Sequence, residues 1–155
     1  MRKIDIKDQQ IIRTLQRNGR MTNQDLAAEV NLSPSPCLRR LKLLEQDGVI
    51  TGYSANIDAE AYGIPVTAFV HIKLANHTEA AVKQFEADIE RVDQVLECYV
   101  MTGTSDYLLR VVVADLPDYE NFVRKKLHSI GSIASIDSSF VYGVVKKTNV
   151  FPIVG

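Results

Sequence analysis

The spacing of apolar residues changes near residue 50, and this change constrains the fold more than any other feature of the sequence. Before that point, apolar residues recur every three or four positions, as in amphipathic helices. After residue 65 they alternate every second position, as in strands, and the spacing then changes several more times. In a chain of 155 residues, this pattern predicts an α+β protein with a helical first part and a mixed second part.

Residues 1–50 predict three short helices. Asp5 and Asp8 are candidate N-caps of the first helix, and Asn18-Gly19 supplies its C-terminal stop. Thr22 is placed to cap the second helix, whose apolar residues lie four positions apart on one face. Helices of this length gain most of their stability from packing, so we expect the three to share one small core.

The connection between the second and third helices is tight. Only Asn31 and Leu32 separate the second helix from Ser33, the candidate N-cap of the third. Asparagine accepts a left-handed conformation more readily than other non-glycine residues, which suits so short a turn. The third helix ends before Gly48, which suits the left-handed position after a helix. Two helices joined in this way form a helix-turn-helix, whose second helix can enter the major groove of DNA.

The third helix has two distinct faces. Cys37, Leu41 and Leu44 fall on one face and are expected to pack against the other two helices. The other face and its borders carry the residues expected to contact DNA. These are Ser33, Ser35, Leu38, Arg39, Arg40 and Lys42.

Each type of side chain in this set has a chemical reason to meet DNA. Hydroxyls and N–H groups at the start of a helix favour phosphate oxygens. Arg39 can fork onto O6 and N7 of guanine, and Leu38 can contact a thymine methyl group. Arg40 lies at the border of the face, within reach of either a phosphate or an intramolecular acid. An ordinary solvated helix face explains the same charges, but a leucine at position 38 has no intramolecular role there.

The charge distribution agrees with this assignment, although the net charge is only −1. Residues 1–57 hold nine Lys or Arg against six Asp or Glu, whereas residues 58–155 hold nine against thirteen. A basic first part joined to an acidic remainder suggests that a polyanion meets only the N-terminal part.

Residues 51–65 are expected to form a strand and a hinge. The segment from Val49 to Ile57 is extended in character and predicts a strand that leads away from the helices. Gly63 and Pro65 mark the best boundary between two domains.

The remaining residues predict a ferredoxin-like βαββαβ domain. The order of strand and helix patterns is the split βαβ arrangement, with two related halves. The expected elements are a strand at 66–74, a helix after Thr78, strands at 95–102 and 107–114, a helix from Pro117 and a strand at 136–146.

The helix-turn-helix sequence resembles one known family closely. The stretch from Leu32 to Leu41, continued by Leu44-Glu45 and by Asp47-Gly48-Val49-Ile50, is similar to the Lrp/AsnC ("feast/famine") transcription regulators. Ile4-Asp5 and Asn18-Gly19-Arg20 fit the same pattern, and the likeness covers nearly the whole chain.

This resemblance implies a domain organisation and a function. It implies a winged-type helix-turn-helix DNA-binding domain at 1–50, a strand and hinge at 51–65, and a ferredoxin-like effector-binding and oligomerisation domain at 66–155. The implied partners are double-stranded DNA with a palindromic operator, a small effector such as an amino acid, and further copies of the chain. Dimers that assemble into octamers are the expected oligomers.

The stretch from Gly103 to Tyr107 allows two interpretations. Glycine and aspartate here can simply make a tight hairpin. Alternatively, exposed backbone N–H groups can hold a carboxylate while Asp106 pairs with an ammonium group, and these are the two ends of a free amino acid. The family resemblance favours the second interpretation, with the pocket at a contact between dimers. The expected effector-binding residues are Tyr99, Met101, Thr102, Gly103, Thr104, Asp106, Tyr107, Ser138 and Ser139.

Face-to-face packing of sheets is a plausible way for two copies to associate. The last expected strand carries apolar residues on both of its faces, so neither face of the sheet is fully polar. A sheet with helices on one side leaves its other face to be covered.

Other function classes lack support in the sequence. Cys37 and Cys98 are expected to be reduced thiols, and His71, His77 and His128 have no metal-ligand spacing. No nucleophile elbow or glycine-rich phosphate loop is present, so we expect neither an enzyme nor a cofactor. No apolar run is long enough to cross a bilayer and the N-terminus is charged, which predicts a cytoplasmic protein without a membrane partner.

Two alternatives stay open at this stage. The ferredoxin-like domain can belong to a small-molecule-binding module or an enzyme subunit, with the N-terminal helices as a protein-interaction element. A regulator that has lost effector sensing, and that wraps DNA as an architectural protein, is the second alternative.

Overall fold

The computed structural model describes residues 3–154, and these residues form two compact units. The first unit contains the residues up to 56 together with those from 146 onward. The second unit contains residues 57–145. Each unit has its own hydrophobic core and is described by itself.

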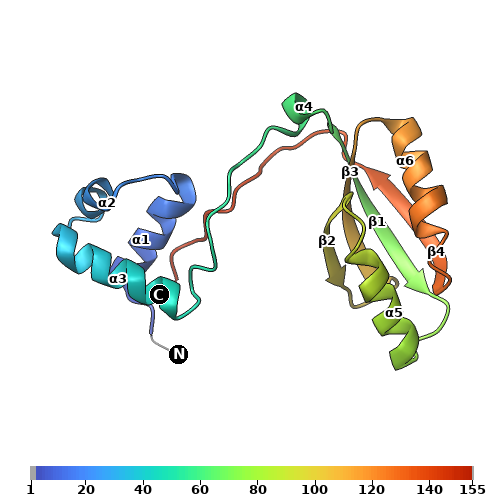
Figure 1. The fold of residues 1–155 in the computed structure, drawn as a ribbon, viewed down its shortest axis with the longest axis horizontal. Coiled ribbons are helices and arrows are strands. Elements are labelled where there is room, and N and C mark those ends of the chain that lie inside the picture. Colours follow the sequence, from blue (N-terminus) through green and yellow to red (C-terminus); the bar gives the residue numbers. More distant parts are fainter. Residues whose placement is uncertain (1–2, 155) are drawn as a thin grey trace. The chain divides into compact units, whose positions relative to one another are not determined.

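The first unit holds three helices, α1 (Ile6–Arg17), α2 (Asn23–Glu29) and α3 (Pro34–Gln46) (Figure 1). The caps expected at Asp5 and Thr22 are present. Asp5 caps α1 in a reciprocal capping box with Asp8, and Thr22 caps α2. Each cap satisfies a backbone N–H that has no partner inside its helix, which explains why these short helices begin where they do.

The core of this unit is small and apolar. Its fully buried side chains come from all three helices and from the turn that joins α2 to α3: Ile11, Leu26, Ala27, Val30, Cys37 and Leu44. Burying a side chain of the size of leucine stabilises a fold by about 1.5–3 kcal/mol, so these few contacts hold the helices together.

The chain after α3 is extended but forms no strand. Gly48 has the left-handed φ of 69° expected of it, and the N–H groups of Val49 and Ile50 both donate to the carbonyl of Leu44. Residues 51–57 form no strand, because no segment within residues 3–154 makes ladder hydrogen bonds with them. The strand expected at 49–57 is therefore absent among the described residues.

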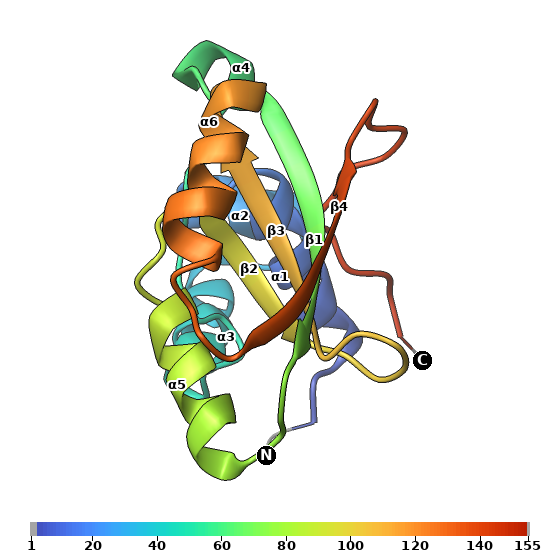
Figure 2. The ribbon, with the colours of Figure 1, turned by 90° about the vertical axis from the view of Figure 1, so that its right-hand side faces the viewer.

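The second unit begins with α4 (Ala59–Tyr62) and continues as a ferredoxin-like domain. The predicted βαββαβ order is confirmed. Its elements are β1 (Val66–Leu74), α5 (Glu79–Ile89), β2 (Val95–Val100), β3 (Tyr107–Val113), α6 (Leu116–Phe122), a π-helical turn η1 (Val123–Leu127) and β4 (Ile133–Phe140). The sheet is antiparallel with strand order β2-β3-β1-β4, and α5 and α6 cover the same face of it (Figure 2).

The covered face of the sheet builds the main core. β1 contributes Ala68, Val70, Ile72 and Leu74, and these residues alternate with side chains that point to the other face. Tyr107, Leu109, Val111 and Val113 of β3 pack beside them, under Phe85, Phe122 and Leu127 of the helices. The open face has no helix on it within this unit.

β4 differs from the prediction at both ends. It begins at Ile133 rather than Ile136 and ends at Phe140 rather than Lys146. β4 lies at the edge of the sheet and pairs with β1. It ends at Phe140 because this residue already lies opposite Ala68, near the start of β1. One further hydrogen bond joins the N–H of Val141 to Thr67, and the chain then leaves the sheet.

Residues from 146 onward group in space with the three helices, although from the sequence they are assigned to the ferredoxin-like domain. No helix among residues 3–154 has the length and apolar character needed to cross a membrane.

Candidate functional site

The start of α3 is held firmly against α2. Asn31 takes the left-handed conformation expected in the turn, with φ of 53°. The side-chain amide of Asn23 donates to the carbonyl of Pro34 at 2.9 Å, and Lys7 of α1 donates to the carbonyl of Val30 at 2.6 Å. The bond from Asn23 joins α2 to the first turn of α3, and the bond from Lys7 joins α1 to the end of α2. Together they brace the helix-turn-helix that presents α3.

Ser33 occupies the N-cap of α3 but makes no side-chain capping hydrogen bond. Pro34 is the first helical residue, where its missing N–H costs nothing. The hydroxyl of Ser33 is exposed at a helix N-terminus, where an anion is favoured.

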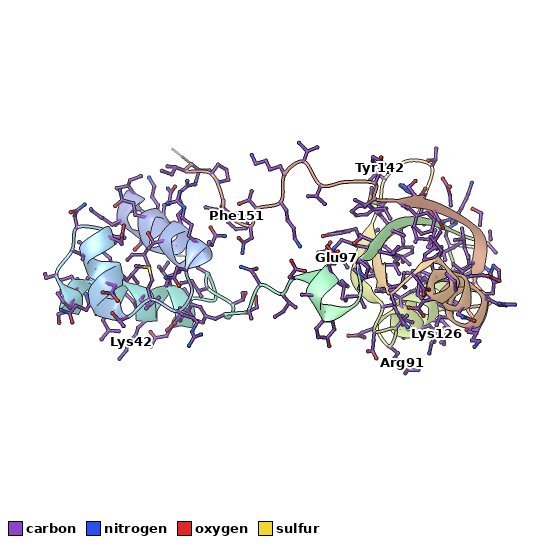
Figure 3. All side chains as sticks on the ribbon, turned by 90° about the horizontal axis from the view of Figure 1, so that it is seen from above. Lys42, Arg91, Glu97, Lys126, Tyr142 and Phe151 are labelled. Carbon is purple, nitrogen blue, oxygen red and sulfur yellow. The ribbon has the colours of Figure 1, made fainter. Side chains whose placement is uncertain are left out.

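α3 separates its apolar and polar residues as predicted. Cys37 and Leu44 are fully buried, and Leu41 packs against the same core. The opposite face forms a shallow concavity, which we call the α3 face. It is lined by Ser35, Leu38, Arg39, Lys42, Leu43 and Gln46. Lys42 lies at the surface of this helix (Figure 3).

The three cations of α3 have different environments. Arg40 donates to Asp5 at 2.7 Å and to Asp8 at 2.9 Å, so its guanidinium is engaged within the unit. The pKa of Arg40 is raised, and its hydrogen bonds to Asp5 and then to Asp8 are the two largest causes of this shift. Arg39 and Lys42 are exposed and have no hydrogen bond or ion pair with residues 3–154. The sequence left open whether Arg40 contacts a DNA phosphate or an acid within the chain, and the structure supports the acid.

In the second unit, residues 101–106 form the corner between β2 and β3, and all of them except Ser105 are expected effector residues. Gly103 has a φ of 115°, which only glycine adopts without strain. Thr102, Gly103 and Thr104 are exposed at the tip. The N–H of Met101 donates to the carbonyl of Asp106 at 2.8 Å, which closes the base of the corner.

Asp106 joins this corner to β1 and to the loop before α5. One carboxylate oxygen accepts from the N–H of Leu74 at 2.7 Å, and the other lies 2.8 Å from Nε2 of His77. The hydrogen bond from Leu74, followed by that from His77, lowers the pKa of Asp106, so the group is an anion at neutral pH. The sequence indicates no role for His77 in this site, because nothing in the spacing of residues 77 and 106 relates them.

Tyr107 belongs to the core rather than to the exposed corner. Its ring lies 4.5 Å from that of Phe85, and its hydroxyl donates to Glu86 at 2.9 Å. Burial and the hydrogen bond to Glu86 raise its pKa to about 12. Its placement fixes the first residue of β3 under α5.

The structure separates the two expected serines on β4. Ser138 lies opposite Val70 on the covered face and hydrogen-bonds with the hydroxyl of Tyr119. Ser139 lies opposite Phe69 on the open face. Because successive strand residues point to opposite faces, the two hydroxyls cannot line the same side of one pocket.

Tyr99 shares the open face with Ser139. It lies opposite Leu108 on β3 and is half exposed, with its hydroxyl 2.9 Å from Glu97. That hydrogen bond is the largest cause of the raised pKa of Tyr99. The open face also carries an ion pair between Arg110 and Glu97 at 2.7 Å.

Metal chemistry has no support in the described part of the chain. No group of three or more His, Cys, Asp or Glu residues within 3–154 is placed to hold an ion. Cys37 is buried and Cys98 is exposed, and both are free thiols.

Comparisons with known proteins agree with this reading of the two units. A winged helix-turn-helix DNA-binding model matches residues 4–51, and an Lrp/AsnC ligand-binding domain model matches residues 67–151. The chain is 36% identical to the transcriptional regulator AzlB of Bacillus subtilis, over 97% of this chain and 96% of the relative. It is 40% identical to the Bkd operon transcriptional regulator of Pseudomonas aeruginosa, over 90% of this chain and 92% of the relative.

Solved structures give the same result. A transcriptional regulator from Neisseria meningitidis, in complex with L-methionine, superposes with a TM-score of 0.93 at 37% identity, over 97% of each chain. The AsnC protein of Escherichia coli superposes with a TM-score of 0.86 at 25% identity, over 97% of this chain and all of the other. A helix-turn-helix is followed by a ferredoxin-like ligand-binding domain, and the relatives match over nearly the whole length of the chain. The chain therefore belongs to the Lrp/AsnC family of DNA-binding transcription regulators.

Proposed function

We propose that the α3 face reads operator DNA in the major groove. The observation that carries this proposal is the contrast among the cations of α3, since Arg40 is engaged internally while Arg39 and Lys42 are exposed. Arg39 forks onto guanine, and Lys42 contacts a phosphate.

Two further features of the α3 face support this role. Leu38 is 39% exposed on an otherwise polar surface, where it suits a thymine methyl group. Ser33 and Ser35 are exposed in and before the first turn, where hydroxyls and backbone N–H groups favour a phosphate oxygen. Arg40 acts indirectly, by holding α3 against α1.

The effector is a free amino acid that binds at the corner formed by residues 101–106. The related Neisseria regulator was solved with L-methionine, which has the same two charged ends as every amino acid. Backbone N–H groups at the exposed tip hold its carboxylate, and Asp106 holds its ammonium group. Each oxygen of Asp106 accepts one hydrogen bond within the chain, and a carboxylate oxygen has capacity for a second.

The chain acts as a homodimer that assembles further, up to an octamer. The open face of the sheet carries the half-exposed Tyr99 and the partly buried Phe69 and Leu108. Burial of these apolar side chains against a second copy would stabilise a dimer. Tyr99 and Ser139 lie on this face, so an effector site at a contact between dimers can include them. Two copies of α3 related by a two-fold axis read a palindromic operator, with half-sites about 34 Å or a multiple of that distance apart.

An electrophoretic titration of the upstream DNA, with and without amino acids, tests the proposal. We expect binding that weakens steeply as salt is raised, because phosphate contacts release counterions. Binding that shifts with one amino acid supports the effector role. If no upstream DNA is bound at low salt, the role of the α3 face is wrong and a small-molecule-binding module is favoured. If calorimetry gives no heat with any of the twenty amino acids, the effector role is wrong and an architectural role is favoured.

A further inference from the structure

One face of α1 carries three long polar side chains that the DNA-reading and effector roles do not use. Gln9, Arg13 and Gln16 lie four and three positions apart, so they project from the same side of the helix. All three hydrogen-bond to the main chain of residues 149–154, which run extended along α1 (Figures 1 and 3). We call residues 149–154 the C-terminal segment.

The two glutamines pair with this segment as a neighbouring strand would. The amide of Gln9 donates to the carbonyl of Val154 at 2.8 Å and accepts from the N–H of the same residue at 2.9 Å. The amide of Gln16 accepts from the N–H of Phe151 at 3.0 Å and donates to the carbonyl of Asn149 at 2.5 Å. A carboxamide has the donor and acceptor of a peptide group, so each glutamine satisfies two main-chain groups.

The spacing of the contacts fits the geometry of a helix beside an extended chain. Seven helical residues, from Gln9 to Gln16, rise about 10.5 Å. Three extended residues, from Val154 back to Phe151, span about 10 Å. Arg13 lies between the two glutamines and donates to the carbonyl of Phe151. The contacts are therefore in register, with the segment antiparallel to α1.

Main-chain hydrogen bonds, rather than side-chain burial, hold the C-terminal segment. Phe151, Ile153 and Val154 are 68%, 54% and 65% exposed, so their side chains contribute little packing. The segment also gives the chain a second crossing between its two units. The first crossing lies at residues 56–57 and the second at 145–146.

We propose that this face of α1 is a binding surface for an extended main chain, and that its occupant is the C-terminal segment of the same chain. The segment acts as a strap that ties the DNA-reading helices to the ligand-binding domain a second time. The strap also transmits the ligand state of that domain to α1, a step that rests on the proposed effector role.

Amide hydrogen exchange in the full-length protein tests the docking. In the double variant Gln9→Ala/Gln16→Ala, the N–H groups of Phe151 and Val154 lose their acceptors, and we expect each to exchange roughly tenfold faster. The matched control is Gln24→Ala, which removes an exposed glutamine of α2 that has no hydrogen bond with residues 3–154. Equal exchange in the double variant and the control would overturn the docking.

Cross-linking decides whether the segment belongs to the same chain. The variant Gln16→Cys/Asn149→Cys, made in a Cys98→Ser background, keeps the contacts of Gln9 and Arg13 with the segment. It is treated with a short thiol cross-linker, and Cys37 stays protected by burial. A product of monomer mass is expected. A product of dimer mass would show that the segment comes from a second copy and would overturn the strap.

The transmitting role has its own readout. We expect the double variant and a chain that ends at Lys147 to bind operator DNA, with less than a twofold change when the amino acid is added. A wild-type ligand response in both variants would overturn the transmitting role. If the wild-type protein itself lacks a response, the effector role and the transmitting role fail together, while amide exchange still decides the docking.

Discussion

The guanidinium of Arg40 on α3 donates to the carboxylate of Asp8 on α1 at 2.9 Å, and Asp8 is the only charged side chain that is buried among residues 3–154. A carboxylate without its cation in such a place is costly, since burial removes the water that would solvate it. The pair therefore fixes α3 against α1, and Arg40 has a structural role, unlike its exposed neighbour Arg39.

Removal of this cation is expected to destabilise the helical unit. For Arg40→Ala we expect the free energy of unfolding to fall by about 1–3 kcal/mol, because the buried carboxylate of Asp8 loses the hydrogen bond that Arg40 donates. Urea unfolding followed through the NMR signals of residues 3–50 measures the change. Arg39→Ala is the control and should change stability by less than about 0.5 kcal/mol. Equal stability of the two variants would contradict the structural role of Arg40.

DNA binding should rank the same two variants in the opposite order. When both proteins are folded, Arg39→Ala should lose more operator affinity than Arg40→Ala. Arg39→Ala is expected to weaken binding to the specific operator by about 1–3 kcal/mol, which is roughly tenfold or more, through loss of the guanine contact. Footprinting at a temperature where both proteins are folded measures it. Arg124→Ala, which removes an exposed arginine of the second unit, should leave the footprint unchanged. An unchanged footprint with Arg39→Ala would remove this residue from the reading face.

Features that depend on local sequence could be predicted correctly. The caps at Asp5 and Thr22, the left-handed Asn31 and the alternating strand β1 each follow from a few neighbouring residues and one backbone preference. The order of elements in the ferredoxin-like domain follows from such local patterns as well. The α3 face could be predicted for the same reason, because a helix fixes which side chains share a side.

Features that depend on pairing between distant segments could not be predicted. From the sequence, Ser138 and Ser139 are expected together as effector-binding hydroxyls, and the pattern could not show that the register of β4 on β1 puts them on opposite faces of the sheet. It also gave no sign that His77 would meet Asp106, since a corner and a loop 29 positions apart must first be brought together by the sheet.

The position of the C-terminal segment is a third case of this kind. Nothing in the sequence pattern relates Gln9 or Gln16 to residues more than 130 positions away. The signal that could have indicated it is a repeat of glutamine and arginine on one side of α1, a face too polar for the core and not part of the DNA-reading helix.

Acid should weaken the helical unit through Asp5. Its backbone hydrogen bond with Asp8, and then its bond from Arg40, lower the pKa of Asp5 below its ordinary value of 3.8. A group with a lowered folded pKa contributes stability that is complete above its unfolded pKa and is lost as pH falls through the folded one. We therefore expect the stability difference between wild type and Asp5→Asn to be constant above about pH 5 and to shrink below pH 3.8. Urea midpoints across this range test it, and a difference that persists unchanged at the lowest pH would contradict it.

The charge of Asp106 should decide how tightly an amino acid binds. In Asp106→Asn the side-chain oxygen can still accept from the N–H of Leu74, so the corner keeps its shape while its anion is removed. The ammonium group then loses a charged hydrogen bond, so we expect L-methionine to bind more weakly, by roughly tenfold or more, as measured by calorimetry. The control is His77→Ala, which keeps the carboxylate of Asp106 and removes the imidazole that is hydrogen-bonded to it. Because the ammonium group then meets no competitor, this variant should bind at least as tightly as wild type. Equal affinity of Asp106→Asn and wild type would show that the ammonium group is held elsewhere, and weaker binding by His77→Ala would show that the histidine contacts the ligand itself.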